Sequence, residues 1–385
     1  MKRVTKILLV QPSLDPPGGG NLVAAWMLQA LREDHALSLL TWQPPDLAAC
    51  NRHFGTALRE DDYQLHCAPP LVRRLARVSP TPAALLKDAY LMRRARDLAA
   101  EHDVAITCNN ETDFGRRGIQ YISYPKLSPV RPAVDLHWYH ASRAALALYY
   151  RVAARIARFS VARMKTNLTL VNSAYMAGGV RALHGIDPIV LYPPVVGERA
   201  APAWAERENG FVCVGRLSRE KRLDTAVEIV RRVRAGGDDV ALHVIGVPDD
   251  RGHVRLVRRL ARRHADWMRL HMDLSRAELT RLVARQRYGV HAMVDEPFGI
   301  AVAEMLRAGC VTFVHASGGP AEIVGERAEL LWSDVDDAVD KIRAVLRDPS
   351  RQSALRGHIA TRAALFSADR FCAELRALVR DFGKA

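Results

Sequence analysis

Residues 296–324, EPFGIAVAEMLRAGCVTFVHASGGPAEIV, decide the fold of this chain. They place two carboxylates, Glu296 and Glu304, eight positions apart across a loop that enters a helix. Pro297 and Gly299 suit the start of that helix, because proline is tolerated in a first turn and glycine leaves the backbone open to a ligand. The stretch therefore predicts a strand–loop–helix unit with acids at its ligand-facing end.

The same stretch continues with a second unit. The apolar run 311–314 predicts a buried parallel strand, and another helix is expected after the glycines at 318–319. Free backbone N–H groups at a helix start bind phosphate, and carboxylates accept hydrogen bonds from sugar hydroxyls. The pattern favours a nucleotide-sugar site. The alternative is an ordinary strand–helix unit whose first acid is favoured by the helix dipole.

Length and composition predict two domains. A chain of 385 residues fits two cores of roughly 150–200 residues each. The Pro-rich segment near 193 is typical of a linker. We therefore expect an N-terminal domain, a linker, a C-terminal domain and a final helix that packs back on the N-terminal domain, with boundaries at 1–192, 193–207, 208–365 and 366–385.

Both halves read as alternating strands and helices, which predicts an α/β fold with two Rossmann-like, doubly wound parallel sheets facing a cleft. Strands are expected at 6–10, 36–41, 104–108, 120–123, 168–172, 210–214, 240–245, 289–293 and 311–314. Helices are expected at 22–31, 223–235 and 254–264.

The location of the protein is predicted from what the sequence lacks. Six cysteines are scattered without a CxxC pair, so a reducing cytoplasm is the default. No run approaches the roughly 20 apolar residues of a spanning helix, and the N-terminus reads as a first strand rather than a signal peptide. The sequence leaves the oligomeric state open.

The formal net charge of +14 predicts an anionic partner. No acidic residue lies between Asp135 and Asp187, and within the basic segment 143–165 one helical face carries Arg151, Arg155 and Arg158. An apolar stripe is expected beside it, formed by Val152, Ile156 and Phe159. Such a helix suits peripheral contact with an anionic membrane. The alternative is a surface helix docked on its own sheet.

Two further strings contribute candidate ligands. Gly18-Gly19-Gly20 follow the first strand and precede a helix, so their backbone can approach a phosphate or sugar, although a complete G-x-G-x-x-G is not met. In the string FVCVGRLSREKRLDTAVEIV from residue 211, Arg216 and Lys221 follow a strand. Two fixed cations there would hold a diphosphate. Alone, they would be ordinary surface cations.

Together these strings resemble retaining glycosyltransferases of family 4, which have the GT-B fold. Within that family, the sequence most resembles the mannosyltransferases that extend lipid-linked oligosaccharides. The resemblance implies that Glu296 orients the transferred sugar, Glu304 holds the ribose diol, and Arg216 and Lys221 bind the donor pyrophosphate. It also implies donor contacts from a glycine set and the helix start, namely Gly19, Gly20, Gly215, Phe298, Gly299 and Ile300.

On the acceptor side the sequence departs from the family. Its members often carry a histidine in a Y-x-H-Y-P string, whereas this chain has Tyr121-Ile122-Ser123-Tyr124-Pro125. We expect the acceptor side to include Ser123, Tyr124 and Asn172. His137 and His140 lie nearby in sequence and are the candidates to replace the missing histidine.

The resemblance implies a hexosyltransferase that retains anomeric configuration and needs neither cofactor nor metal. The donor would be a GDP- or UDP-linked sugar and the acceptor a glycan, glycolipid or small molecule. The Asp334-Val335-Asp336 string resembles a metal-binding DxD but sits before the C-terminal helices. Two alternatives stay open: a GT-B nucleotide-sugar epimerase, and a non-enzymatic basic protein that binds nucleic acid or membrane. The low aromatic content of 6% and the lack of a docking motif argue against nucleic acid.

Overall fold

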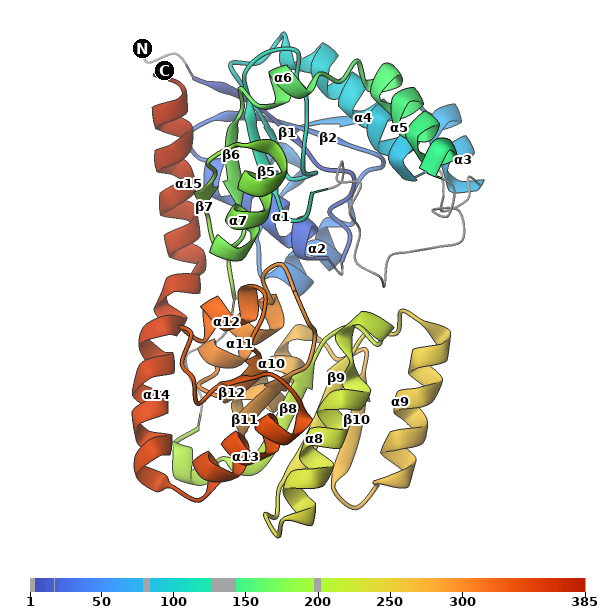
Figure 1. Ribbon diagram of the computed structural model, residues 1–385. Helices are drawn as coiled ribbons and strands as arrows, with labels where there is room; N and C mark the ends of the chain where they lie inside the picture. Colours follow the sequence, from blue (N-terminus) through green and yellow to red (C-terminus); the bar gives the residue numbers. More distant parts are fainter. Residues whose placement is uncertain (1–3, 17, 79–83, 126–142, 197–201, 385) are drawn as a thin grey trace. The chain divides into compact units, whose positions relative to one another are not determined.

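The computed structural model describes residues 4–16, 18–78, 84–125, 143–196 and 202–384 (Figure 1). The chain forms two compact units. Unit 1 comprises Met1–Pro194 and Ala368–Ala385, and unit 2 comprises Val195–Ser367. Each unit is a parallel sheet flanked by helices, which confirms the expected GT-B architecture of two Rossmann-like halves.

Within the described residues, the sheet of unit 1 has the order β3-β2-β1-β4-β5-β6-β7. Its strands are β1 (Lys6–Val10), β2 (Ala36–Thr41), β3 (Gln64–Cys67), β4 (Val104–Thr107), β5 (Ile119–Ile122), β6 (Leu168–Val171) and β7 (Ile189–Val190). Its helices are α1 (Gly19–Leu31), α2 (Leu47–Phe54), α3 (Pro70–Val78), α4 (Ala84–Ala99), α5 (Arg143–Ala157), α6 (Val161–Met164), α7 (Ala174–His184) and α15 (Ala368–Phe382).

The sheet of unit 2 has the order β10-β9-β8-β11-β12-β13 in the described part of the chain. Its strands are β8 (Glu208–Val214), β9 (Ala241–Gly246), β10 (Met268–Met272), β11 (Gln286–His291), β12 (Val311–His315) and β13 (Leu331–Trp332). Its helices are α8 (Leu223–Ala235), α9 (Arg251–Arg263), α10 (Arg276–Ala284), α11 (Ile300–Arg307), α12 (Gly319–Ile323), α13 (Val335–Leu346) and α14 (Pro349–Ala363).

The central strands form because their residues are apolar on both faces. In β1 the segment 7–10 is buried throughout, and β12 buries 311–314. A parallel strand covered by helices on both sides has this continuous pattern. Several helix ends are set by local chemistry: the Ser173 side chain accepts from Met176 N at the start of α7, and Gly185 ends that helix with a φ of 63°.

The structure corrects several sequence expectations. The predicted helix 254–264 begins earlier, at Arg251, because the Asp250 side chain caps it. Asp334 is the N-cap of α13, accepting from Asp337 N, so it lies at a helix start rather than in a loop. Asp336 forms an ion pair with Arg232 at 2.6 Å. The first aspartate of the DxD string therefore caps a helix, and the second forms an ion pair at the surface.

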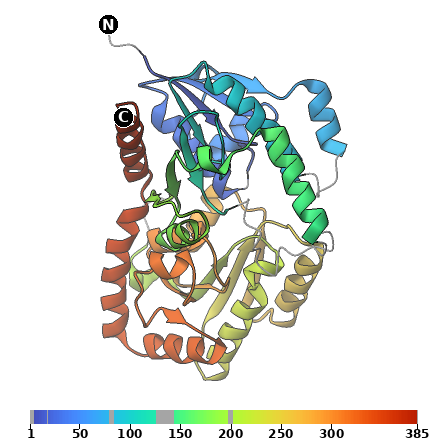
Figure 2. The same cartoon turned by 45° about the horizontal axis from the view of Figure 1, so that its top comes forward.

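Helix α5 also differs from the expectation. It lies against α4 rather than on the sheet, as both views show (Figure 1, Figure 2). The contact buries Ala153 and Ala157 of α5 against Ala89 of α4, and Phe159 packs on this same cluster. Phe159 therefore belongs to the buried side and not to an exposed stripe.

The C-terminal helix α15 belongs to unit 1, where it packs on α1. Its Arg376 Nε donates to Ala30 O of that helix at 2.7 Å. The preceding helix, α14, belongs to unit 2. The end of the chain therefore contributes to both units.

A buried carboxylate fixes the loop after β4. Asp113 is 1% exposed and accepts from Gly115 N and Ser160 N, both at 2.8 Å. Its oxygens also receive Arg163 Nε and Nη2 at 3.1 and 2.8 Å. Burial alone raises the pKa of Asp113, but the hydrogen bonds from Arg163 and the two backbone amides outweigh it, so the pKa lies below its ordinary value. This network ties the β4–β5 connection to the start of α6.

We expect Asp113→Asn to lower the free energy of unfolding by about 2–3 kcal/mol at neutral pH, because it weakens several charge-assisted hydrogen bonds at a buried site. Urea unfolding measures this difference. The contribution is full above the ordinary carboxyl pKa of about 4 and declines as pH falls through the lower folded value. Asp187→Asn is the matched control: its pair with Arg181 is exposed, so it should change stability by less than about 0.5 kcal/mol. Equal effects of the two variants would contradict this role for Asp113.

Candidate active site

The centre of the candidate site is the Glu296 carboxylate. Lys221 Nζ donates to its Oε1 at 2.6 Å, and His291 Nε2 contacts Oε2. His291 is 2% exposed, and the side chains of Lys221 and Glu296 are 14% and 13% exposed. One carboxylate is thus held between a lysine ammonium group and a histidine ring in a largely water-excluded place.

The charge state of Glu296 follows from this pairing. Burial raises the pKa of the carboxyl, but the charges of His291 and Lys221 and their hydrogen bonds lower it by more. The pKa of Glu296 therefore lies far below its ordinary value. The group is an anion at every physiological pH and can only accept hydrogen bonds.

Parallel strand order brings these three residues together. Strands β8 and β11 are neighbours, so their carboxyl ends meet at one edge of the sheet. Lys221 ends a short 3-10 helix, Arg219–Lys221, soon after β8, and His291 is the last residue of β11. Glu296 lies in the loop between β11 and α11. Residues 75 positions apart are therefore in contact.

Two glycines allow the loop that carries Glu296 to pack closely against the turn after β12. Gly319 N donates to Glu296 O at 2.8 Å. A Cβ on Gly318 would lie 2.5 Å from Glu296 O, and one on Gly319 would lie 2.6 Å from Phe298 Cα. Gly318 also has a φ of 75°, which favours glycine. No other residue fits this turn without moving the loop.

Helix α11 begins with an open backbone. Its N-cap is Gly299, with a φ of 101° and no side-chain hydrogen bond to the first turn. Helix starts without such caps keep amide N–H groups available for an anion. Further along the helix, Glu304 Oε1 accepts from Arg276 Nη1 at 2.6 Å, and Arg276 also donates to Val196 O. Glu304 is thus already oriented by a cation.

Arg216 lies at the same edge of the sheet but has different partners. Its Nη1 donates to Asp249 Oδ2 at 2.5 Å and its Nη2 to Glu220 Oε1 at 2.8 Å. The side chain is 52% exposed. A guanidinium has five N–H donors, so two carboxylate contacts leave others for a phosphate. Neither of these two carboxylates belongs to the Lys221–Glu296 pair.

The remaining donor-side residues take supporting positions. Phe298 is 3% exposed and packs edge-on against Phe366, with ring centroids 5.8 Å apart, so its side chain belongs to the core. Ile300 is the first residue of α11. Gly215 follows β8, where a Cβ would lie 3.5 Å from the Lys221 side chain. Gly19 and Gly20 are the first residues of α1, in unit 1.

The acceptor-side residues converge on Asn110 within unit 1. Asn110 Oδ1 accepts from Ser123 N at 2.9 Å and from Tyr124 N at 3.1 Å, and Asn172 Nδ2 donates to Ser123 O at 3.2 Å. Ser123, Tyr124 and Asn172 therefore share one hydrogen-bonded corner beyond the ends of β5 and β6. His137 and His140 lie outside the described residues.

Sequence reasoning missed two partners, His291 and Arg276. Each follows or ends a strand of unit 2: His291 ends β11, and Arg276 opens α10 after β10. Their position near a strand end was the sequence signal that could have pointed to these two residues. It could not show that Arg276 meets Glu304, 28 residues away, because that contact depends on the placement of α10 beside α11.

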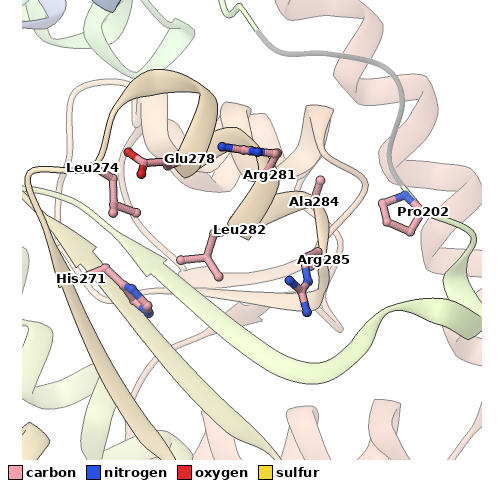
Figure 3. Close-up of a pocket in the computed structure, with 8 residues that line it drawn as sticks. All are labelled: Pro202, His271, Leu274, Glu278, Arg281, Leu282, Ala284 and Arg285. Atoms are coloured by element: carbon pink, nitrogen blue, oxygen red, sulfur yellow. The ribbon is translucent and has the colours of Figure 1, made fainter.

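A separate cavity of about 480 Å³ lies along α10 (Figure 3). It contains none of the predicted donor residues. It is lined by Pro202, His271, Leu274, Glu278, Arg281, Leu282, Ala284 and Arg285. Arg285 is paired with Glu208 at 2.6 Å. His271 stacks on His243 with an interplanar angle of 18° and a nitrogen separation of 3.0 Å.

Among the residues that the structure describes, no group of three or more His, Cys, Asp and Glu side chains is arranged to hold a metal ion. The independence from metal that the sequence implies stays a prediction.

Comparisons with known proteins bear on the unit that carries Glu296. The family model "Glycosyl transferases group 1" matches residues 197–362. A GDP-Man:Man(3)GlcNAc(2)-PP-Dol alpha-1,2-mannosyltransferase of Candida glabrata is 28% identical over 171 residues, 40% of this chain and 34% of that protein. The Dictyostelium discoideum enzyme of the same name is 24% identical over 222 residues, 52% of this chain and 44% of that protein. The chain thus matches less than half the length of these relatives.

Solved structures of other proteins share the fold of this chain over nearly its whole length. HepE of Anabaena, in complex with UDP and glucose, has a TM-score of 0.68 at 15% identity, covering 98% of this chain and 99% of that one. WaaG, a glycosyltransferase involved in lipopolysaccharide biosynthesis, has a TM-score of 0.65 at 14% identity, covering 96% and 99%. These likenesses establish the GT-B fold.

Proposed function

We propose, from the premise that residues 197–362 form a glycosyl transferases group 1 domain, that this chain is a retaining hexosyltransferase. It moves a sugar from a nucleoside diphosphate to a hydroxyl acceptor. The observation that carries the proposal is the Glu296 carboxylate, ionised between Lys221 and His291 beside the open start of α11. An anion there accepts hydrogen bonds from sugar hydroxyls while N–H groups and cations meet the diphosphate.

The proposed donor is GDP-mannose, with a UDP-linked hexose as the second candidate. The names of the curated relatives specify GDP-Man. The Anabaena structure holds UDP and glucose. Glu304 would accept from the two ribose hydroxyls, which both nucleotides share. The base is therefore selected elsewhere, and loops near the ends of β9 and β10 are the candidates.

The proposed acceptor is a hydroxyl of a lipid-linked glycan at the cytoplasmic face of a membrane. The support is the polyprenyl-linked acceptor in the names of the relatives and the basic segment 143–165. Ser123, Tyr124 and Asn172 are the proposed acceptor-side residues in unit 1.

In the proposed reaction, the bond between the anomeric carbon and the diphosphate oxygen breaks as the acceptor oxygen bonds to the same face of the sugar. The acceptor proton passes to the departing phosphate oxygen, so no enzymic nucleophile or separate base is consumed. Lys221 and Arg216 stabilise the negative charge that develops on the diphosphate. Glu296 holds the sugar in position, which limits the entropy cost of reaching the transition state.

We expect Glu296→Gln, Lys221→Ala and Arg216→Ala each to lower kcat about 100- to 1,000-fold, the effect of losing one preorganised charge at a reacting centre. Release of GDP or UDP from a panel of linked hexoses measures the rate, after thermal shifts have identified the donor that binds. Arg219→Ala is the control, since Arg219 is exposed on the same short helix and should retain full activity. Near-normal turnover in two of the three variants would refute the assigned site.

We expect EDTA to leave the transfer rate within about twofold, because cationic side chains replace the metal clamp that contributes several kcal/mol in metal-dependent transferases. NMR of the product should show the anomeric configuration of the donor. A loss of activity that added Mg²⁺ restores would contradict metal independence, and an inverted product would contradict retention.

A further inference from the structure

Helix α5 exposes an aliphatic stripe to solvent. Leu148, Val152 and Ile156 are 61%, 43% and 41% exposed, although leucine, valine and isoleucine are among the residues most often buried. They are four positions apart, so they lie on one face of the helix. Three neighbouring aliphatic side chains on one face form a continuous apolar surface.

The stripe is separate from the face that α5 buries within unit 1. Helix α5 buries Ala153 and Ala157 against α4, and at 3.6 residues per turn these residues lie on a different face from the stripe. Arg151 and Arg155 border the stripe on the side turned away from that contact, given 3.6 residues per turn. Both are exposed, and neither has an ion-pair partner among the residues that the structure describes.

The combination of charge and apolar surface identifies the partner. An anionic bilayer offers phosphates to arginine and acyl chains to leucine, valine and isoleucine. A second copy of this helix would bring unpaired arginines together, which is repulsive. Nucleic acid would use the arginines but leave the aliphatic stripe in water. Among the described residues no helix is long and apolar enough to cross a membrane.

We propose that α5 seats this chain on an anionic lipid bilayer, lying in the plane of the surface. Leu148, Val152 and Ile156 enter the boundary between headgroups and acyl chains, while Arg151 and Arg155 contact lipid phosphates. The proposal rests on the proposed function in one respect: a lipid-linked acceptor would be presented at the surface on which the enzyme sits.

The test is flotation of the full chain with vesicles of phosphatidylcholine, with and without phosphatidylglycerol. Wild type should bind only the mixed vesicles. Arg151→Gln/Arg155→Gln should weaken binding about 25-fold, since each arginine near an anionic surface contributes about fivefold. Leu148→Ser/Val152→Ser/Ile156→Ser should weaken binding at high salt, where the apolar contribution remains. The matched control is Arg255→Gln/Arg259→Gln, exposed arginines with the same spacing on α9 of unit 2, which should bind like wild type.

The possible outcomes distinguish failure of the membrane-binding proposal from failure of the proposed transferase function. Thermal melting shows that each variant is folded, and nucleotide release with a water-soluble acceptor reports the chemistry. Wild-type-like vesicle binding by both α5 variants would overturn the proposal, as would equal loss in the α9 control. A serine variant that converts a dimer into a monomer would assign the stripe to self-association instead. Vesicle binding without any transfer would leave the surface proposal standing and refute the proposed function.

A second inference concerns His291. Its ring touches one oxygen of Glu296 while Lys221 holds the other. The ring is 2% exposed and His291 is the last residue of β11, so we expect it to act on a bound sugar through the carboxylate. We infer that His291 is a positioning residue, which fixes the orientation of Glu296 toward the donor sugar.

The test compares His291→Ala with His291→Gln. The alanine variant should lower kcat about 10- to 100-fold with little change in the donor KM, the effect of losing a hydrogen bond to a charged group. Because His291 lowers the pKa of Glu296, its removal should move the acid limb of the pH–rate profile to higher pH. Glutamine should restore part of kcat, since it replaces the hydrogen-bond donor, but not the acid limb.

An activity-independent measurement accompanies this test. Carbon-13 NMR titration of glutamate carboxyls, with the Glu296 signal assigned by its absence in Glu296→Gln, should show a higher pKa in His291→Ala. An unchanged profile and an unchanged titration would overturn the role of His291. A shifted titration in a chain that transfers no sugar would refute the proposed function and leave the pairing intact.

Discussion

The Glu296 carboxylate is the group around which unit 2 is arranged. A buried carboxylate is costly unless cations and donors satisfy it. Lys221 comes from the end of β8 and His291 from the end of β11, so the pairing requires these strands to be neighbours. The ionisation of the site therefore depends on the order of the sheet. A different strand order would leave the buried carboxylate without its partners.

The turn after β12 supports the same group from behind. Gly318 and Gly319 contact the backbone of residues 295–298 so closely that a side chain would displace the loop. Ser317 Oγ adds a polar link, accepting from Asp295 N at 2.9 Å and contacting His315 Nδ1 at 2.8 Å. These contacts hold the loop by its backbone, so the orientation of the carboxylate depends on Lys221 and His291.

The two units use the same topology for different tasks. Unit 2 concentrates paired charges at the carboxyl ends of its strands, where a phosphorylated donor would bind. Unit 1 has the side-chain amides of Asn110 and Asn172 and backbone groups at the corresponding corner. Its helix α4 packs on the sheet, and α5 packs on α4. Among the described residues, α5 buries Ala153 and Ala157 against α4 and exposes Leu148, Val152 and Ile156 on another face. Donor binding and surface attachment are thus proposed for separate units.

The sequence by itself determined the fold class, because continuous apolar runs such as 7–10 and 311–314 can be buried only between helix layers. It also singled out Arg216, Lys221, Glu296 and Glu304 as candidate donor-binding residues, through strings that resemble the family's motifs. Only the tertiary structure decided which charges pair: Arg216 with Asp249 and Glu220, Glu304 with Arg276, and Glu296 with His291. It likewise placed Phe159 in the α4–α5 contact and left Leu148 exposed. The physical reason is the same in both cases. Local periodicity defines the faces of an element, whereas partners distant in sequence depend on strand order and helix placement.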